Sequence, residues 1–449
     1  MNICQKTLRG LNIKMTIAGI ITSIIFIAVF ALILSEKIDR MVVSICGATA
    51  MIIVGDILNF YDYKQALAMI ELDTIILLLG MMTLISMLEK TGAFEYMAIK
   101  IAQLSKGRPV MLFLMLVTTT AFISMFLDNV TTVVLIAPVT IAITKLLKLS
   151  CVPYLIGEAI LSNIGGLATI IGDPPNLIIG SSVQDLSFIS FMIHLGPFAL
   201  IAFLLTAFLF IKIFKKDFDK EPSDLKVMMA MKPEDSISDR EGAKKLLYVF
   251  GVIIFGFFIA EYIHIRPSLI AITGAAIGFI VTKYNIEETI SRVDISILIF
   301  FSGLFVTVGG LKYSGVLDLM ATSLTGLAKH DMLLCCIVTI WVAAFASAIL
   351  DNIPFTIAMI PMIQSLGQHL GDMNAITPLW WALALGVGLG GNGSVIGATA
   401  NVIVVKLSEK TDTPITSKIW SKSGLITTMT SLVLTSILFW VFYSFMSTK

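Results

Sequence analysis

The chain has 449 residues, of which 57% are hydrophobic and only 14% are charged. A soluble globular domain carries about a quarter charged residues, so this composition excludes that class and indicates a protein that lies in a lipid bilayer. The net charge of +1 excludes the strongly basic balance of nucleic-acid-binding proteins.

The first half of the chain, residues 1–211, contains five predicted transmembrane segments and one longer apolar block. Runs of about 20 apolar residues are long enough to cross a bilayer. The predicted segments are 15–35, 41–58, 72–89, 152–180 and 191–212. The block at 110–148 is about twice as long, and we interpret it as a helical hairpin that enters and leaves the membrane from one face.

Residues 212–245 form the one long polar stretch and predict a solvated linker. With this linker in the cytoplasm, 23 of the 31 lysines and arginines fall on the cytoplasmic side. This bias follows the positive-inside rule. We therefore predict a multi-pass protein of the plasma (inner) membrane with a cytoplasmic central linker.

The second half, residues 246–449, repeats the plan of the first half. Its predicted segments are 246–264, 268–284, 294–312, 380–405 and 424–446, with an extra block at 331–368 that again predicts a hairpin. Each half thus has about five transmembrane helices, a re-entrant hairpin and a broken helix, at 152–180 in the first half and 380–405 in the second.

Short motifs indicate that the two halves are related in sequence. Leu127-Asp128-Asn129-Val130 recurs as Leu350-Asp351-Asn352-Ile353, and further along the chain Asn176 recurs as Asn401. We call the separation between such matching positions the repeat offset. An odd number of spans per half turns the second repeat upside down in the membrane. We predict an all-α fold of two inverted repeats, which is typical of secondary transporters.

The predicted hairpin tips carry acidic residues deep in apolar sequence. A charge at membrane depth costs roughly 2.5–3.5 kcal/mol, so it usually faces a cavity, a partner or an ion. Carboxylate, amide and hydroxyl oxygens suit a monovalent cation, whereas exposed N–H groups suit an anion. The tip candidates are Asp128, Asn129, Thr131, Thr132, Asp351 and Asn352. The alternative is that each aspartate only caps the following helix.

Glycine and proline interrupt the apolar segments at 152–180 and 380–405. Irregular backbone at membrane depth is tolerated where it is buried in protein or lines a cavity. The candidates here are Asn163, Gly165, Gly166, Thr169, Asp173, Asn176, Gly391, Asn392, Ser394 and Asn401. The alternative is that the glycines only permit close helix packing. Asp173 is the weaker candidate, since a loop at the mouth of the site would place it in water.

No motif of an intramembrane enzyme is present, because the sequence lacks an HExxH pair and a GxSG nucleophile with a partner histidine. We therefore expect no enzymatic activity and no cofactor. The expected coupling ion is H⁺ or Na⁺.

The segments LDNVTTVVLIAPV, NIGGLATIIGDPPN, LDNIPFTIAMIPM and GGNGSVIGATAN resemble the arsenite permease, NhaD-type sodium/proton antiporter and melanosomal P-protein branch of the ion transporter superfamily. The resemblance implies a homodimer, a scaffold part and a transport part, and elevator-like alternating access. By similarity to the divalent-anion/sodium symporters, which have a similar architecture, it implies Na⁺ sites at Asp128, Asn129 and Thr131 and at Asp351 and Asn352. The second tip lacks the threonine, and the aspartates themselves favour a proton-linked mechanism.

The hypothesis from the sequence is a secondary active transporter of a small inorganic ion, coupled to H⁺ or Na⁺. Sodium/proton antiport and arsenite or antimonite efflux both fit it. The alternatives are a sodium-coupled transporter of citrate-like carboxylates or divalent anions, and a passive ion channel.

Overall fold

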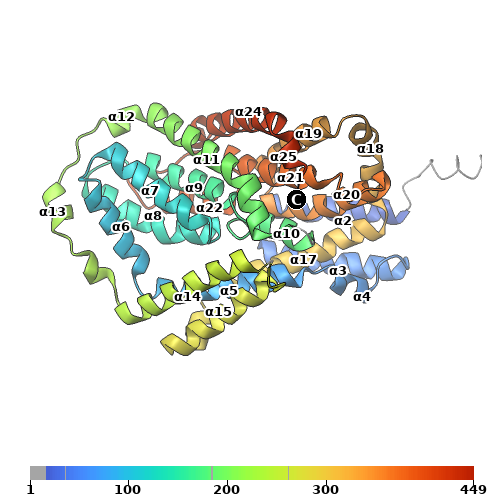
Figure 1. Ribbon diagram of the computed structural model, residues 1–449, viewed down its shortest axis with the longest axis horizontal. Helices are drawn as coiled ribbons and strands as arrows, with labels where there is room; N and C mark the ends of the chain where they lie inside the picture. Colours follow the sequence, from blue (N-terminus) through green and yellow to red (C-terminus); the bar gives the residue numbers. More distant parts are fainter. Residues whose placement is uncertain (1–16, 36, 184–185, 261, 449) are drawn as a thin grey trace, which may run out of the picture. The chain divides into compact units, whose positions relative to one another are not determined.

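The computed structural model describes residues 17–35, 37–183, 186–260 and 262–448, and these residues form helices and loops (Figure 1). Among them are nine helices long and apolar enough to cross a membrane and three shorter apolar helices. The predicted all-α, multi-pass membrane fold is therefore confirmed. Residues 15 and 16 of the first predicted span lie outside the described residues.

The helices of the first half follow the predicted segments closely. In chain order they are α2 (Ile17–Ser35), α3 (Arg40–Ile57), α4 (Tyr63–Ala68), α5 (Leu72–Glu89), α6 (Ala93–Leu104), α7 (Pro109–Ser124), α8 (Asn129–Leu146), α9 (Val152–Gly166), α10 (Pro174–Ser182) and α11 (Phe188–Ile213). The block at 110–148 is indeed a pair of helices, α7 and α8. The segment at 152–180 is broken between α9 and α10.

The central polar stretch contains only short helices of its own, since its first two residues end α11 and its last six begin the next long helix. The short elements are α12 (Lys215–Phe218), α13 (Leu225–Ala230) and η1 (Pro233–Ser236). The long helix α14 (Arg240–Ile259) begins where Asp239 accepts a hydrogen bond from the Gly242 amide and so caps it.

The second half repeats the element order of the first. After α14 come α15 (Pro267–Thr282), α16 (Ile286–Ile290), α17 (Ile295–Tyr313), α18 (Val316–His330), α19 (Met332–Ile349), α20 (Asn352–Leu370), α21 (Thr377–Gly390), η2 (Gly391–Gly393), α22 (Thr399–Ser408), α23 (Ser417–Trp420), η3 (Ser421–Leu425), α24 (Ile426–Val441) and α25 (Tyr443–Met446). The starts of α4, α5, α6, α7 and α8 recur in α16 to α20 at the repeat offset of the two tip aspartates. Those of α9 and α10 recur in α21 and α22 at the slightly larger offset of Asn176 and Asn401.

The chain divides into two compact units that do not coincide with the two halves. Unit 1 consists of the residues up to Ile75, Ile295–Cys335 and Ile357–Ile376. Unit 2 consists of Ile76–Asp294, Cys336–Thr356 and Thr377–Lys449. Each unit therefore takes segments from both repeats.

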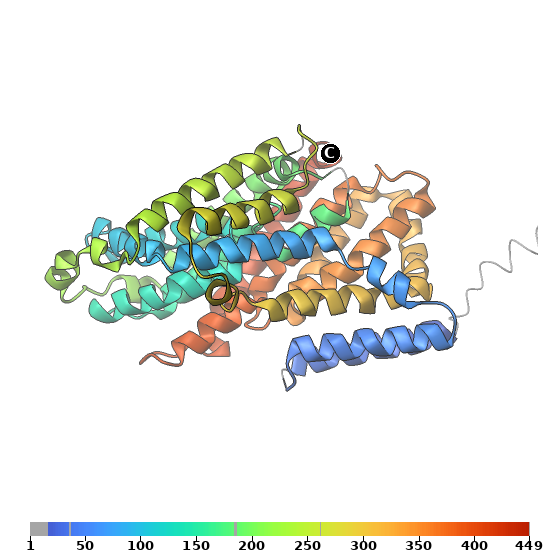
Figure 2. The ribbon, with the colours of Figure 1, turned by 90° about the horizontal axis from the view of Figure 1, so that it is seen from below.

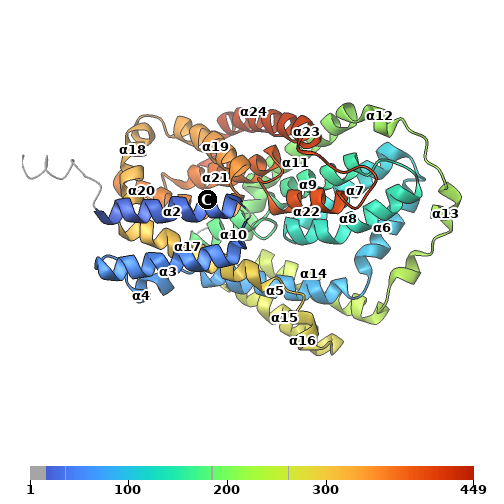
Figure 3. The same cartoon turned by 180° about the vertical axis from the view of Figure 1, so that it is seen from behind.

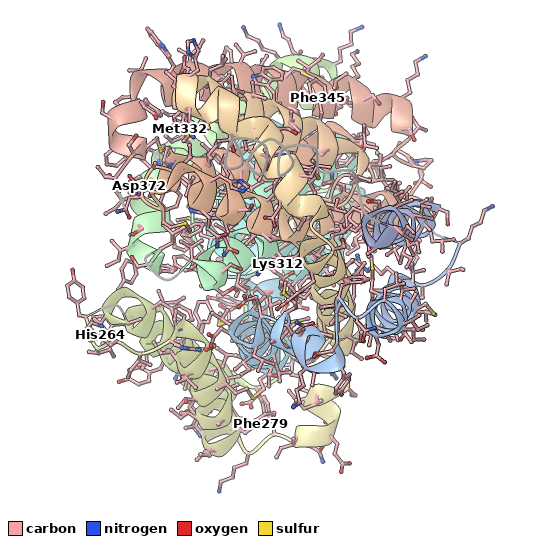
Figure 4. The ribbon with its side chains drawn as sticks, turned by 90° about the vertical axis from the view of Figure 1, so that its right-hand side faces the viewer. His264, Phe279, Lys312, Met332, Phe345 and Asp372 are labelled. Atoms are coloured by element: carbon pink, nitrogen blue, oxygen red, sulfur yellow. The ribbon has the colours of Figure 1, made fainter. Side chains whose placement is uncertain are left out.

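Unit 1 is held together by close packing of α2, α3 and α17. A Cβ on Gly303 of α17 would lie 2.8 Å from the backbone of Ser44 on α3, so the small residue allows the helices to approach. The Tyr61 hydroxyl donates to the Val306 carbonyl at 2.9 Å. Lys312, near the end of α17, is exposed (Figure 4).

Unit 2 contains the α14–α15 pair and both sets of tips and broken helices. Figure 2 shows α14 and α15 (yellow-green and yellow) running side by side, and Gly80 of α5 packs against Ala271 of α15. In Figure 4, His264 marks the turn between α14 and α15, and Phe279 lies near the far end of α15. Figures 1 and 3 both show α7, α8, α9 and α22 side by side, and this group positions the candidate site.

Candidate functional site

The first hairpin tip is capped by its own aspartate. Asp128 precedes α8, and its Oδ1 accepts from the Thr131 amide at 2.9 Å. The Thr131 hydroxyl donates to Asp128 Oδ2 at 2.5 Å, and the Thr132 hydroxyl donates to the Asp128 carbonyl at 3.0 Å. The capping interpretation therefore describes this tip. It leaves the partly exposed Asp128 close to the site.

The second tip satisfies its aspartate differently. Pro354 stands where Thr131 stands in the first tip, so the matching position offers no hydroxyl. Instead the Thr399 hydroxyl, at the start of α22, donates to Asp351 Oδ2 at 3.3 Å. The tips thus share an aspartate and a threonine hydroxyl, but the hydroxyl comes from different helices.

At each break in the two broken helices, an asparagine side chain donates hydrogen bonds to backbone carbonyls. Asn176 Nδ2 donates to the carbonyls of Leu167 and Thr169 at 3.0 and 2.9 Å. Asn401 Nδ2 donates to the carbonyls of Gly391 and Ser394 at 2.8 and 2.9 Å. These bonds satisfy carbonyls that the interrupted helices leave free. The two asparagines therefore stabilise the breaks, and an ion-binding role for them stays a prediction.

Matching serine and threonine hydroxyls tie each hairpin to its broken helix. Ser124 donates to the Ser162 carbonyl at 2.8 Å, and Ser347 donates to the Val387 carbonyl at the same distance. Thr169 donates to the Met125 carbonyl, and its counterpart Ser394 donates to the Ala348 carbonyl. The same two links therefore occur in both repeats.

The glycines of the breaks lie where two backbones nearly touch. A Cβ on Gly165 would lie 2.2 Å from the Ala121 carbonyl oxygen, and one on Gly166 would lie 2.3 Å from that of Gly172. A Cβ on Gly391 would likewise lie 2.9 Å from the Gly397 carbonyl oxygen. The packing alternative thus describes these glycines, and an ion-binding role for them stays a prediction.

Asp173 lies where the two hairpin tips meet. Its side chain is fully buried, so the expectation that a loop would place it in water is wrong. Its Oδ1 accepts from Asn129 Nδ2 of the first tip and from Asn352 Nδ2 of the second, each at 3.4 Å. Its Oδ2 has no hydrogen-bond partner among the described residues. The structure therefore places Asp173, the weaker candidate from the sequence, between the two hairpin tips.

A chain of buried amides extends from Asp173 across both repeats. Asn129 Nδ2 also donates to Asn163 Oδ1 at 2.7 Å. Asn163 Nδ2 in turn donates to Asn392 Oδ1 at 2.8 Å and to Asn401 Oδ1 at 3.2 Å. The structure thus brings Asn129 of the first tip together with Asn163, Asn392 and Asn401 of the broken helices, whereas Asn176 bonds backbone carbonyls instead.

The electrostatic environment of the site is negative. Asp351 and Asp128 both lie close enough to Asp173 for their charges to act on it. Residues 109–183 and 332–408 contain three lysines, all exposed, and no arginine. No ion pair joins Asp128 or Asp173 to a basic residue in the part of the chain that the structure describes.

The described residues contain no group of three or more histidines, cysteines, aspartates and glutamates arranged to hold a metal ion. In the predicted first Na⁺ site, Asp128 and Thr131 bond each other while the Asn129 amide donates to Asp173. In the predicted second site, Asn352 also donates to Asp173. Both Na⁺ sites stay predictions.

Three residues that hydrogen-bond within the candidate site were missed by reasoning from the sequence. Ser124 and Ser347 are separated by the same repeat offset as the two tip aspartates, so this offset was a signal that would have found them. Thr399 has no such signal, because its counterpart in the first repeat is Pro174. Only the folded arrangement brings Thr399 to Asp351.

Comparison with known proteins agrees with this architecture. A "46 kDa membrane protein" of Mycobacterium leprae is 36% identical over 96% of this chain and all of its own length. An uncharacterized transporter of Mycobacterium tuberculosis is 35% identical over 95% of this chain and 99% of its own. The P protein of Sus scrofa is 32% identical over 89% of this chain, which spans 56% of that protein.

A solved structure shows a similar fold. The YdaH transporter of Alcanivorax borkumensis matches with a TM-score of 0.58 at 13% identity, over 82% of this chain and 85% of its own. Residues 30–386 match the family described as "Citrate transporter". The resemblance to the ion transporter superfamily is thereby confirmed, and the chain is a membrane transporter that belongs to the citrate transporter (CitMHS) family.

Proposed function

We propose that the protein is a secondary active transporter that exchanges a small monovalent cation, Na⁺ or Li⁺, for protons. The observation that carries this proposal is the Asp173 carboxylate, which is fully buried and accepts from an amide of each hairpin tip. Its second oxygen has no partner in the described part of the chain. A carboxylate in this position needs either a proton or a cation.

Competition for the free oxygen of Asp173 supplies the coupling. A proton on Oδ2 removes the negative charge and with it the attraction for a cation. A bound cation satisfies the same oxygen and makes protonation unfavourable. One carboxylate that alternates between these two partners therefore links the two fluxes in opposite directions.

The two tip aspartates extend this site in the proposal. Asp128 and Asp351 add negative charge near Asp173 and hold the tips in place through their threonine partners. We assign the cation to Asp173 together with these aspartates, Asn129 and Asn352. A hydrated cation that enters would replace its water with carboxylate and amide oxygens.

Unit 2 contains all sixteen candidate residues, and we assign it the role of the transport part. Elevator-like movement of this part and a homodimer, which the family resemblance implies, and a cytoplasmic central linker, which the distribution of lysines and arginines predicts, complete the proposal. Accessibility of cysteines placed in the linker, 212–245, to a membrane-impermeant reagent in intact cells tests its side.

A citrate-like anion is the second candidate substrate, and two observations favour it. The family is described as "Citrate transporter". In addition, four helices, α8, α10, α20 and α22, begin at the site, and the N-terminal ends of helices attract anions. Because the site is acidic and lacks arginine, such an anion would require a bound cation to neutralise it.

Flux into proteoliposomes with an internal pH-sensitive dye separates these functions. Na⁺, Li⁺, arsenite and citrate are added in turn to vesicles that contain the wild type, Asp173→Asn or Asp128→Asn. Proton movement that follows Na⁺ or Li⁺ and is lost in Asp173→Asn supports exchange. The absence of proton movement on adding Na⁺ or Li⁺, together with Asp173-dependent uptake of citrate or flux of arsenite, would contradict it. Flux that does not saturate and needs no gradient of a second ion would indicate a channel.

A further inference from the structure

A second buried carboxylate lies in unit 2, away from the Asp173 site. Glu158 is on α9 and is fully buried. The Thr140 hydroxyl of α8 donates to its Oε1 at 2.5 Å, and its Oε2 has no hydrogen-bond partner among the described residues. A lone carboxylate sealed in an apolar interior is costly in its charged form.

Among the described residues around Glu158, no basic group is placed to neutralise it. The helices packed against α9 are α7, α8, α11, α21, α22 and η2. α12 also contacts α9, because Phe218 lies against Tyr154. Besides Glu158, the titratable residues of these helices, together with Cys151 just before α9, are Lys145, Cys151, Tyr154, His194, Lys212, Lys215, Lys216, Asp217 and Lys406. The lysines are exposed, Cys151 contacts Thr411, and Asp217 pairs with Lys220. Tyr154 donates to the Pro109 carbonyl, and the His194 ring bonds Ser190 and Thr448.

The second repeat shows that the fold does not require this acid. The positions that match Glu158 and Thr140 by the repeat offsets are Leu383 and Ile363, which are both buried. Apolar residues therefore fill the matching positions in one repeat. The acid and the hydroxyl in the other repeat have a reason other than packing.

Glu158 is linked to the candidate site through the two helices that carry it. α8 and α9 are joined by the bond from Thr140 to Glu158 and also by the bond from Asn129 to Asn163. Along α9, Glu158 lies one and a half helical turns before Asn163, or about 7.5 Å at the usual rise of ~1.5 Å per residue. A change of charge at Glu158 therefore acts on the same helix pair that holds the tip of the first hairpin.

We propose that Glu158 is a proton-binding site of the transporter, separate from the Asp173 site, and that its proton is bound and released during transport. The proton resides on Oε2 while the site is closed. It passes to water when the group is opened to solvent, and the Thr140 hydroxyl then stabilises the ionised oxygen. The role in transport rests on the proposed exchange of cations for protons, whereas proton binding itself does not.

Infrared difference spectroscopy on the purified full-length protein tests proton binding without transport. The wild type should show the carbonyl stretches of protonated carboxylic acids. One component of this signal should disappear in alkaline buffer, remain in Asp173→Asn and be absent from Glu158→Gln, which separates Glu158 from the Asp173 site. Glu95→Gln is the matched control, because Glu95 also has a buried oxygen without a partner in the described chain, and it should keep the signal. A signal unchanged in Glu158→Gln, or one that persists in the wild type at every pH, would overturn the proposal.

A second pair of variants distinguishes the loss of proton binding from the loss of folding. Thr140→Val removes the donor to the ionised form, so the signal should persist into more alkaline buffer. Glu158→Leu copies the second repeat and should fold, yet it should lose the signal and lower the number of protons moved per Na⁺. If the wild type moves no protons with cations, the exchange function fails while the infrared result still decides proton binding. An unchanged proton-to-cation ratio in Glu158→Leu would overturn the role in transport.

Discussion

The broken helix of the first repeat and that of the second share their scaffold but differ in their polar groups. Asn176 and Asn401 close the two breaks with the same bonds, and Ser124 and Ser347 tie the two hairpins in the same way. These duplicated contacts hold backbone in place. Duplication therefore marks the residues that build the site.

Other matching positions are polar in the first repeat but hold small, non-polar residues in the second. Asp173 corresponds to Ala398, and Asn163 corresponds to Gly388. A Cβ on Gly388 would lie 2.9 Å from the side chain of Leu167. These two residues occupy the positions that correspond to Asn163 and Asn392, which are hydrogen-bonded to each other. The same pair of positions is therefore polar in one case and apolar in the other. The site therefore contains one central carboxylate and one amide chain rather than two symmetric sites. We therefore assign ion binding to the residues that differ between the two repeats.

The largest expected effect is that of changing Asp173. Asp173→Asn should abolish cation-driven proton flux, because an amide cannot bind a proton or balance the charge of a cation. Asp173→Ala, which copies the second repeat, should do the same. Asp173→Asn should not lower the thermal stability, since it removes a buried charge that lies near two other carboxylates and keeps an acceptor oxygen. Asp173→Ala leaves the buried Asn352 amide without its acceptor and should cost about 1–3 kcal/mol.

Asp128→Asn is the control for this comparison, because asparagine also caps helices. It should fold normally and retain a measurable fraction of transport. Flux in proteoliposomes and thermal unfolding in detergent measure the two properties. Wild-type flux in Asp173→Asn would remove Asp173 from the centre of the site.

The next effect concerns the scaffold and should be equal in the two repeats. Gly165→Ala and Gly390→Ala place a Cβ 2.2 Å and 2.4 Å from the carbonyl oxygens of Ala121 and Ala344. Each should destabilise the protein by about 1–3 kcal/mol, as overpacking does. Gly251→Ala is the control, because a Cβ there meets nothing within 4 Å. Unequal losses of thermal stability would show that the two scaffolds are not equivalent.

A smaller effect should separate the two asparagines. Asn176→Ala and Asn401→Ala each leave buried carbonyls without a donor, at a cost of about 1–3 kcal/mol. Asn401 Oδ1 also accepts from Asn163, whereas Asn176 Oδ1 has no partner among the described residues. Asn401→Ala should therefore lower the affinity for the transported cation more, measured as the concentration for half-maximal flux. A larger loss of affinity in Asn176→Ala would contradict this assignment.

Most of the architecture was predictable because long apolar runs and glycine-proline clusters are strong local signals. The hairpin at 110–148 became α7 and α8, and the break after Gly166 lies within the predicted segment. The amphipathic helices α6 and α18 were missed, since their polar residues interrupt the apolar run on which the prediction depended. They nevertheless begin at matching positions of the two halves, Ala93 and Val316, so the repeat would have linked them.

Many of the residues that the structure brings together at the candidate site were named from the sequence, but the central position of Asp173 was not. Asp173 precedes Pro174 and Pro175, a sequence that indicates a loop, yet proline also suits the first turn of a helix and here begins α10. The burial of Asp173 depends on Asn129 and Asn352, which come from hairpins far away in sequence. A local sequence pattern cannot predict that two hairpins so far apart in sequence meet at Asp173.

The smallest expected effect lies outside the membrane spans, at a tyrosine that is itself repeated. Tyr61 and Tyr284 occupy matching positions of the two halves, but the Tyr61 hydroxyl donates to the Val306 carbonyl, whereas that of Tyr284 donates to Asp239 at 2.7 Å. The hydrogen bond from Tyr284, and then that from the Gly242 amide, lower the pKa of Asp239. A lowered pKa means that the carboxylate stabilises the folded state above its unfolded pKa, and that this contribution is lost as the pH falls through the folded pKa.

Tyr284→Phe should therefore destabilise the protein by less than about 1 kcal/mol at neutral pH, because the bond is partly open to water. The difference from the wild type should vanish in acid, where Asp239 is protonated in both proteins. Tyr61→Phe is the matched control: its partner is a carbonyl, so its loss of stability should not depend on pH. Thermal unfolding of both variants in neutral and acidic buffer measures this contrast. A pH-independent loss in Tyr284→Phe would show that its hydroxyl stabilises the fold through contacts other than the ionised Asp239.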